Sequence, residues 1–518
     1  MKKHRRKSLL SAVTLFGLTL VCFAGAQTGF RSLNDAWGPR YQPALHIPKT
    51  STHPGPNGTG PANRIRHWNE LAINASGLDH TPVALGENRI FGEQLGPVRA
   101  SRAMAIVHIA VFETVNAIDG SCQSYIGLGR ARQDASMECA IAQAACETLD
   151  ALFPSQQATF NQQLANELSQ IPNNRPKADG IALGHLAAST ILSLRANDNS
   201  QQAEPHVGIE FITSNDPGKW RQDPISQHPL ALGAYWGQVT PFVLQYSKQF
   251  RAPLPPAINS PEYAVAFNEA KSLGGDGATT PTTRTAEQTQ IGIFWAYDGT
   301  PSLCAPPRLY NQITMQIADQ MGTSANPAEL ARLLALVNVA MADAGIAIWE
   351  SKYYYQYWRP VTGIREADAG TGPTELGEGN PATAGDPTFS PLGAPASNLN
   401  GPNFTPPFPS YPSGHGGFGG ALFETLRKFY QTDEIAFTFT SDEFNGVTRD
   451  NGGNVRPVIT RSFSSLSQAE EENGQSRIYL GIHWSFDKTE AIAQGRRVAD
   501  YVFTNAFLPV QKGNPHGK

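Results

Sequence analysis

Apolar residues recur at helical spacing, three or four positions apart, along most of the chain after residue 97. This spacing gathers apolar side chains on one face of a helix, where a neighbouring helix can bury them. Strand signals are few and short. The pattern predicts helices over residues 98–118, 135–152, 156–171, 175–195, 260–272, 285–297, 307–321, 327–357, 416–430 and 486–508. We therefore expect an all-α protein, with two stacked four-helix-type bundles joined by long loops.

Other segments lack this periodicity. Residues 27–96 are rich in Pro, Gly and Asn, with one short helical candidate over 65–75, and we expect an irregular extension that wraps around the body. Residues 366–408 would form a loop of a length that is usually functional in a compact protein. The expected organisation is an irregular N-terminal extension (27–96), an N-terminal helical half (97–284) and a C-terminal helical half (285–518).

The first 26 residues have the pattern of a signal peptide. Five basic residues precede an apolar run over 9–23, and Ala24-Gly25-Ala26 is a plausible cleavage site that leaves Gln27 first. The run is short for a membrane anchor. We therefore expect export to the periplasm or the extracellular space. Arg5-Arg6 would suit twin-arginine export, but Ser8 occupies a position where that route favours an apolar residue, so both routes stay open.

Composition and charge narrow the partners. The chain is 40% hydrophobic and 16% charged, which is typical of a globular protein. Cleavage would remove five basic residues and no acidic ones, so the formal charge would change from -4 to -9. An acidic surface argues against a nucleic-acid partner, because phosphate contacts need clustered Lys and Arg. Any anion must therefore be bound in a local positive pocket.

Four cysteines remain after cleavage: Cys122, Cys139, Cys146 and Cys304. An exported protein can form one or two disulfides from them. Their spacing matches no zinc pattern, and burial as small apolar residues is an equally good interpretation.

Lys352 and Arg359 lie seven positions apart near the end of an apolar helix. On a continuous helix they would share one face, two turns and about 10 Å apart along the axis. The helix is expected to end at Arg359-Pro360, because a residue before proline disfavours helical geometry. Two such cations need carboxylates or an anion as partners, although an isolated pair is more often two surface charges.

Ser413, Gly414 and His415 follow a proline-rich run at the expected start of a helix. Ser413 is a good N-cap, and Gly414 lets the backbone approach a ligand closely. The free N–H groups of a helix N-terminus form an anion site, and His415 could exchange protons beside it. Alone, such a short motif is also common in ordinary loops.

Arg477 and His483 lie six positions apart, which would place them on different faces of one continuous helix. A bend at Gly481 would bring them to one point. Asp487, one turn after His483, could orient the imidazole or cap the following helix.

The three clusters in this order resemble the signature of a superfamily that unites type-2 phosphatidic acid phosphatases, bacterial non-specific acid phosphatases and vanadium haloperoxidases. The flanking segments Phe294-Trp-Ala-Tyr-Asp298-Gly and Asp343-Ala-Gly-Ile-Ala-Ile-Trp349 resemble the vanadium chloroperoxidase branch. The resemblance implies that Trp349 and Phe408 line the halide side of the pocket. It also implies that Asp298 pairs with Arg477.

The resemblance further implies one vanadate cofactor per subunit. His483 would be the vanadium ligand, with Lys352, Arg359 and Arg477 neutralising the oxygens and Ser413 and Gly414 donating hydrogen bonds. His415 and Lys352 would act in catalysis, and Asp487 would support His483. The expected reaction is oxidation of bromide and iodide by hydrogen peroxide, with chloride as the more demanding candidate, and halogenation of an organic acceptor.

Two alternatives stay open at this point. The same residues suit a secreted acid phosphatase in which His483 attacks phosphorus and His415 protonates the leaving group. A non-catalytic secreted helical protein is the third interpretation. It predicts that some of the histidines and cations of the site would be absent from the sequence.

Overall fold

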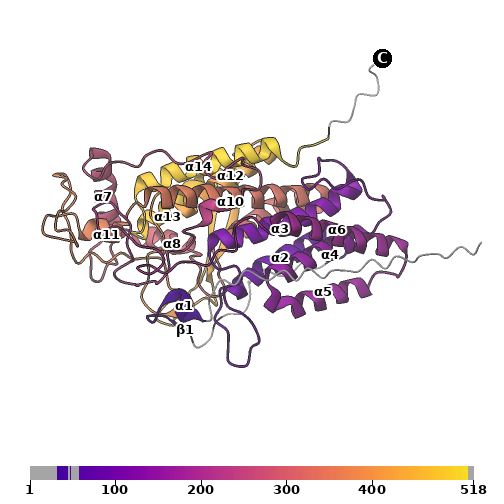
Figure 1. Ribbon diagram of the computed structural model, residues 1–518, viewed down its shortest axis with the longest axis horizontal. Coiled ribbons are helices and arrows are strands. Elements are labelled where there is room, and N and C mark those ends of the chain that lie inside the picture. Colours follow the sequence, from indigo (N-terminus) through magenta and orange to yellow (C-terminus); the bar gives the residue numbers. More distant parts are fainter. Residues whose placement is uncertain (1–31, 45–46, 48–57, 511–518) are drawn as a thin grey trace, which may run out of the picture.

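The computed structural model describes residues 32–44, 47 and 58–510. The expected signal peptide over 1–26 lies outside the described residues. Within them the chain has fourteen α-helices and two small two-stranded sheets, which confirms the all-α class (Figure 1).

The N-terminal helices pack around α4, which contacts α2, α3, α5 and α6. The expected candidate over 65–75 is part of a longer helix, which begins at Pro61 because proline suits the first helical turn. Helix α2 (Pro61–Asp79) lies in the expected extension but contacts α3 and α4. The helices of the N-terminal half itself are α3 (Pro97–Asp119), α4 (Met137–Leu152), α5 (Gln157–Ser169) and α6 (Arg175–Arg195).

The C-terminal half is centred on α10, a 29-residue helix that contacts α3 of the other half as well as α12 and α14. Asn326 caps its start by accepting from two backbone N–H groups. In Figure 1, α10, α12 and α14 run along one another above α8 and α13. Helix α7 (Pro261–Gly274) precedes the expected boundary at residue 285 but contacts α11, α13 and α14 of this half. The helices after the boundary are α8 (Ala286–Phe294), α9 (Pro306–Gln320), α10 (Pro327–Tyr355), α11 (Pro360–Arg365), α12 (Gly414–Tyr430), α13 (Leu466–Tyr479) and α14 (Ser485–Asn505).

Among the described residues, two helices are long and apolar enough to be candidate membrane spans, α3 and α10, and both are core helices. In each, 94% of the tested window is buried within the protein. One continuous hydrophobic core includes residues of both helices. The two helical halves therefore share a single core.

The short elements connect distant parts of the chain. In the N-terminal extension, α1 (Leu33–Trp37) precedes β1 (Gln42–Pro43), which pairs antiparallel with β2 (Leu399–Asn400). The extension is thereby attached to the long loop before Ser413. Three 3₁₀ turns complete the elements: η1 (Pro154–Gln156), η2 (Trp236–Gln238) and η3 (Thr323–Ala325).

One hairpin was not expected. Strand β3 (Phe437–Asn445) pairs antiparallel with β4 (Val458–Phe463), and Phe437 and Phe439 of β3 are buried. The alternation Phe-Thr-Phe-Thr is the two-residue period of a strand with one buried face.

The four cysteines of the described residues are all free. Cys139 and Cys146 are buried on α4, and Cys304 is buried with its Sγ 3.0 Å from Ser76 Oγ. Cys122 is partly exposed. Of the two interpretations, the described chain fits burial of reduced thiols rather than disulfides.

Candidate active site

Lys352 lies near the C-terminal end of α10, with a fully buried side chain. Its Nζ donates to the carbonyl oxygens of Pro409 and Ser410, both at 2.8 Å. The ammonium also lies 5.6 Å from the ring centroid of Trp349 and 5.1 Å from that of Phe408. Burial, together with the neighbouring Arg359, lowers the pKa of Lys352.

The expectation that Arg359 shares a helix with Lys352 is wrong. Helix α10 ends at Tyr355, because Gln356 adopts a left-handed conformation (φ 50°) and its N–H bonds to the Lys352 carbonyl. Arg359 instead precedes Pro360 as the N-cap of α11. Its backbone is extended there, as a residue before proline prefers.

Arg359 nevertheless reaches the same point. Its Nε donates to the Phe408 carbonyl at 3.0 Å, and its Nη1 donates to the Ile482 carbonyl at 2.8 Å. The same Nη1 lies 2.9 Å from His483 Nε2. Burial lowers the pKa of Arg359 to about 9, which leaves it charged at neutral pH.

Ser413 caps α12 as expected. Its Oγ accepts from Gly416 N at 3.3 Å, while its own N–H donates to the Asp487 carbonyl at 3.0 Å. A Cβ on Gly414 would lie 3.3 Å from the Trp349 ring, so glycine leaves room between the start of α12 and this ring. The first N–H groups of a helix have no acceptor within the helix, so they are available to an anion.

His415 is fixed through both its ring and its backbone. Nε2 donates to the Ala296 carbonyl at 2.5 Å, so Nδ1 is the unprotonated nitrogen. The His415 carbonyl accepts from Tyr310 and Asn473. Burial and the nearby Arg477 lower the pKa of His415 well below 6.5, which keeps the imidazole neutral.

His483 follows a bend at Gly481, which has φ 69° and packs so closely on Gly274 that a Cβ would lie 2.5 Å from the Gly274 carbonyl oxygen. Its Nδ1 lies 2.7 Å from Asp487 Oδ2, and the same oxygen accepts from Trp484 N at 3.1 Å. Asp487 therefore both orients the imidazole and caps α14. Burial and three nearby cations lower the pKa of His483 well below 6.5, so Nε2 carries a lone pair.

Arg477 is the last cation of the group and the least satisfied. Its Nη2 donates to Asp298 Oδ1 at 2.6 Å, the pair that the resemblance implied. Within the described residues, its Nε and Nη1 are buried and have no hydrogen-bond partner. Buried guanidinium donors without acceptors are costly, so this side chain is arranged for an acceptor that enters the site.

Cationic groups outnumber carboxylates in this cluster. Lys352, Arg359 and Arg477 lie with two carboxylates, Asp298 and Asp487, and burial lowers the pKa of both histidines well below 6.5. Burial raises the pKa of Asp487 to about 6, which still leaves it ionised at pH 7. A buried group of this composition can hold an anion, whose charge would favour the protonated form of Lys352.

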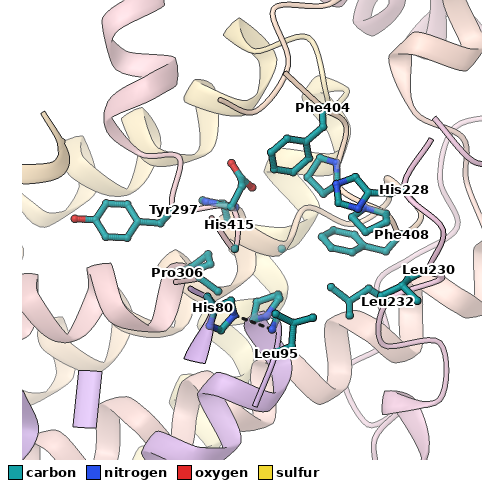
Figure 2. A pocket seen from close by; sticks show the side chains of 18 of the residues that line it. His80, Leu95, His228, Leu230, Leu232, Tyr297, Pro306, Phe404, Phe408 and His415 are labelled. Atoms are coloured by element: carbon teal, nitrogen blue, oxygen red, sulfur yellow. Dashed lines mark hydrogen bonds between the residues drawn. The ribbon is translucent and has the colours of Figure 1, made fainter. Parts of the chain in front are cut away.

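A pocket opens onto this cluster, with an empty volume of about 690 Å³, its mouth included. Figure 2 shows His415, Tyr297 and Pro306 on one side of the pocket and Phe404, His228, Phe408, Leu230 and Leu232 on the other. The lining also includes Gly414, Arg477, His483, Asp298 and Trp349. Lys352, Arg359 and Ser413 are at most 1% exposed and do not line the pocket. Arg359 contacts two residues that do, Phe408 and His483.

Comparison with known proteins agrees with this geometry. Residues 332–512 match the family model described as the VCPO second helical-bundle domain. The chain is 31% identical over 514 residues to vanadium chloroperoxidase from Curvularia inaequalis, covering 83% of this chain and 80% of that protein.

The chain belongs to the vanadium haloperoxidase family.

Solved structures of similar fold come from the same family. A bacterial vanadium-dependent iodoperoxidase superposes with a TM-score of 0.68 at 23% identity, over 88% of this chain and 99% of that one. A bacterial vanadium-dependent chloroperoxidase in its holo form gives a TM-score of 0.57 at 15% identity, over 79% and 92% of the two chains. At these identities the likeness concerns the fold.

The structure of this haloperoxidase brings together all the residues selected from its sequence, but it also adds others. Ser410 was missed: its Oγ donates to Asp487 Oδ2, and its carbonyl accepts from Lys352. The only available signal was its place three residues before Ser413. The pocket wall formed by Trp37, His228 and Phe404 was also missed, since these residues are distant in sequence and carry no motif.

Proposed function

We propose that this enzyme oxidises bromide and iodide with hydrogen peroxide, using one vanadate per chain held in the Arg477–His483 pocket. The observation that carries the proposal is the pair of buried, unpartnered donors of Arg477 in a pocket that the His483 imidazole also lines. Relatives in the family are named for vanadium and for chloride or iodide oxidation.

The donor set fits vanadate. Two free N–H groups of Arg477 and the open start of α12 at Gly414 offer hydrogen bonds to anionic oxygens. His483 Nε2 supplies a nitrogen ligand, its proton being kept on Nδ1 by Asp487. Arg359 and Lys352 add positive charge, and the bound oxyanion would compete with the Ile482, Pro409 and Ser410 carbonyls for their donors.

Bound vanadate would supply a Lewis acid that activates peroxide without a change in oxidation state. The chain's own residues would manage protons and charge around it. His415 Nδ1 is the free base that accepts a proton from incoming peroxide, because Nε2–H is engaged with Ala296. Lys352 would polarise a peroxide oxygen once the bound ligand draws its Nζ away from the Pro409 and Ser410 carbonyls.

Trp349 and Phe408 would form the halide side of the site. Their ring centroids are 4.9 Å apart, and Trp349 Nε1 is held by the Leu232 carbonyl at 3.1 Å. This apolar wall limits water around the halide, which makes the halide a better nucleophile than it is in bulk water. Overall, one halide, one peroxide and one proton give hypohalous acid and water.

The direct test measures bromination of a phenolic dye by protein freed of vanadate and then reconstituted with orthovanadate. We expect a peroxide-dependent rate with bromide or iodide only after vanadate is added. Chloride is harder to oxidise than bromide or iodide, so the rate of chloride oxidation shows whether the site can oxidise all three halides. A phosphatase using the same pocket would instead hydrolyse a phenyl phosphate, with no need for vanadate or peroxide.

The two histidines should separate binding from turnover. His483→Ala removes the nitrogen ligand, so vanadate retention measured after gel filtration should be lost. His415→Ala keeps that ligand, so the protein should retain vanadate but lose halide oxidation. Equal vanadate affinity in wild type and His483→Ala would contradict the assignment of His483.

Export is a separate proposal. The basic and apolar segments before Gln27 support secretion with cleavage after Ala26. Mass spectrometry of the protein recovered outside the cytoplasm should find Gln27 as the first residue. An intact N-terminus in all fractions would contradict it.

A further inference from the structure

The pocket extends beyond the anion cluster into an apolar chamber. We define the apolar chamber by Trp37, Leu95, Leu230, Leu232 and Phe404, all of which line the pocket and are at most 8% exposed. A halide ion and a peroxide do not need so apolar a wall. Sites that bind small organic molecules are lined in this way, mostly by hydrophobic and aromatic side chains with a few polar groups.

One polar side chain of the pocket lining, His228, has a ring nitrogen that lacks a hydrogen-bond partner within the described residues. His228 is 4% exposed and packs at a tilt against Trp37 and Phe404, with ring-centroid distances of 4.6 and 5.3 Å. Its Nδ1 lies 3.3 Å from the Ala36 carbonyl, whereas its Nε2 has no partner within the described residues. Burial lowers the pKa of His228 to about 4, so the ring is neutral and Nε2 is a hydrogen-bond acceptor.

The other histidine of the lining that lies outside the anion cluster, His80, has no such capacity. Its Nδ1 meets the Ser76 carbonyl at 2.8 Å, and its Nε2 accepts from Gly96 N at 2.9 Å. Both ring nitrogens are used in holding the start of α3. Of these two histidines, His228 is therefore the one with a ring nitrogen free to accept a hydrogen bond from a ligand.

We propose that the apolar chamber binds the organic halogen acceptor as an electron-rich phenol, whose hydroxyl donates to His228 Nε2. This inference rests on the proposed function, since it places the acceptor beside the site where hypohalous acid forms. In the reaction a C–X bond forms on the ring and the O–X bond of hypohalous acid breaks. The ring carbon loses its proton, which leaves with the hydroxide as water.

The N-terminal extension is then part of the acceptor site. Trp37 and Ala36 belong to α1, which is kept in place by the β1–β2 pairing and by the packing of Trp37 on Phe404. An acceptor that stacks on Trp37 and Phe404 would be stabilised by aromatic contacts beyond simple burial. An acceptor bound in this way would react with hypohalous acid before the acid diffuses into bulk water.

Binding without turnover tests the hydrogen bond. Full-length wild type, His228→Phe and His185→Phe are titrated with phenol and with anisole, in the absence of peroxide, by ligand-observed NMR. His185→Phe is the matched control, because His185 lies on α6 with a side chain 66% exposed. We expect His228→Phe to weaken phenol binding about fivefold and to leave anisole binding unchanged, because anisole has no hydroxyl to donate.

Three results would overturn the proposal. One is phenol binding that does not saturate in wild type. Another is an equal loss for phenol and anisole in His228→Phe, which would mean that the ring contributes only packing to the pocket wall. An unchanged phenol affinity would also overturn it, and would assign Nε2 to the smaller cavity beside Trp220 and Thr405, which His228 also borders.

A measurement on wild type alone keeps the proposal testable if the variant does not fold. The ratio of ortho to para bromophenol made by reconstituted enzyme is compared with the ratio from added hypobromous acid. A bound phenol predicts different ratios, and identical ratios would contradict it. Iodide oxidation to triiodide needs no organic acceptor. Absence of triiodide formation by reconstituted wild type would therefore contradict the proposed function rather than this inference.

Discussion

Arg477 offers the sharpest test of the anion site, because Arg477 and its partner Asp298 can be changed separately and together. Arg477→Met keeps most of the side-chain length but removes the charge and the two free donors, Nε and Nη1. Each charge-assisted hydrogen bond to an anion contributes about 1.5–3 kcal/mol, so two contribute about 3–6 kcal/mol. We expect affinity for phosphate or orthovanadate to fall by about 10²–10⁴-fold.

The single variant also leaves Asp298 buried without its cation. Its side chain is 4% exposed, and removing one member of such a pair costs about 3–5 kcal/mol of folding stability. Asp298→Asn/Arg477→Met should recover most of this loss and still fail to bind the anion. Asp298→Asn alone should retain measurable binding, because Nε and Nη1 of Arg477 remain.

Isothermal titration with phosphate, followed by competition with orthovanadate, separates these effects, and urea unfolding without anion gives the stability of each variant. In wild type the anion should raise the unfolding midpoint as its concentration exceeds Kd. Wild-type affinity in the double variant would refute the conclusion that Arg477 holds the anion.

Two predictions concern stability away from the site. Burial lowers the pKa of His108 to about 3, so between pH 6.5 and 3 the unfolded chain binds a proton that the folded chain does not. Stability is then lost as pH falls through that window. The unfolding free energy of His108→Gln relative to wild type should therefore shift by about 2 kcal/mol in the variant's favour from pH 7 to pH 5, and a constant difference in urea unfolding would disprove it. Asp343 accepts from the N–H groups of Phe242, Val243 and Leu244 at 2.6–2.9 Å. Asp343→Asn turns one acceptor oxygen into a donor, which should cost about 2–4 kcal/mol and lower the urea midpoint, and an unchanged midpoint would show that this loop is held by other contacts.

The site was accessible from sequence where local geometry decides the structure. Ser413 precedes a helix start, and its hydroxyl accepts from Gly416 N as an N-cap should. Gly481 adopts a positive φ that turns the chain between Arg477 and His483. Asp487 follows His483 at a spacing of four residues, which lets one carboxylate hold both Nδ1 and the start of α14.

Other features depend on contacts that no local pattern encodes. The sequence pattern extended α10 past its end, because the aromatic run after Lys352 is compatible with a helix whereas Gln356 leaves it. Arg359 was selected for its charge, but it reaches His483 from the start of α11 and not from a shared helix face. The chamber wall joins Trp37, His228 and Phe404 from three distant segments, which only tertiary packing brings together.

The most direct measurement of the central claim is a titration of vanadate-free protein with orthovanadate, with triiodide formation from iodide and hydrogen peroxide as the readout. The proposed function predicts a rate that rises linearly to one vanadate per chain and then levels off. Phosphate should shift this titration to higher vanadate concentrations, because it competes for Arg477, and Asp298→Asn/Arg477→Met should show no such rise. A rate that is independent of vanadate with both iodide and bromide would contradict the proposal.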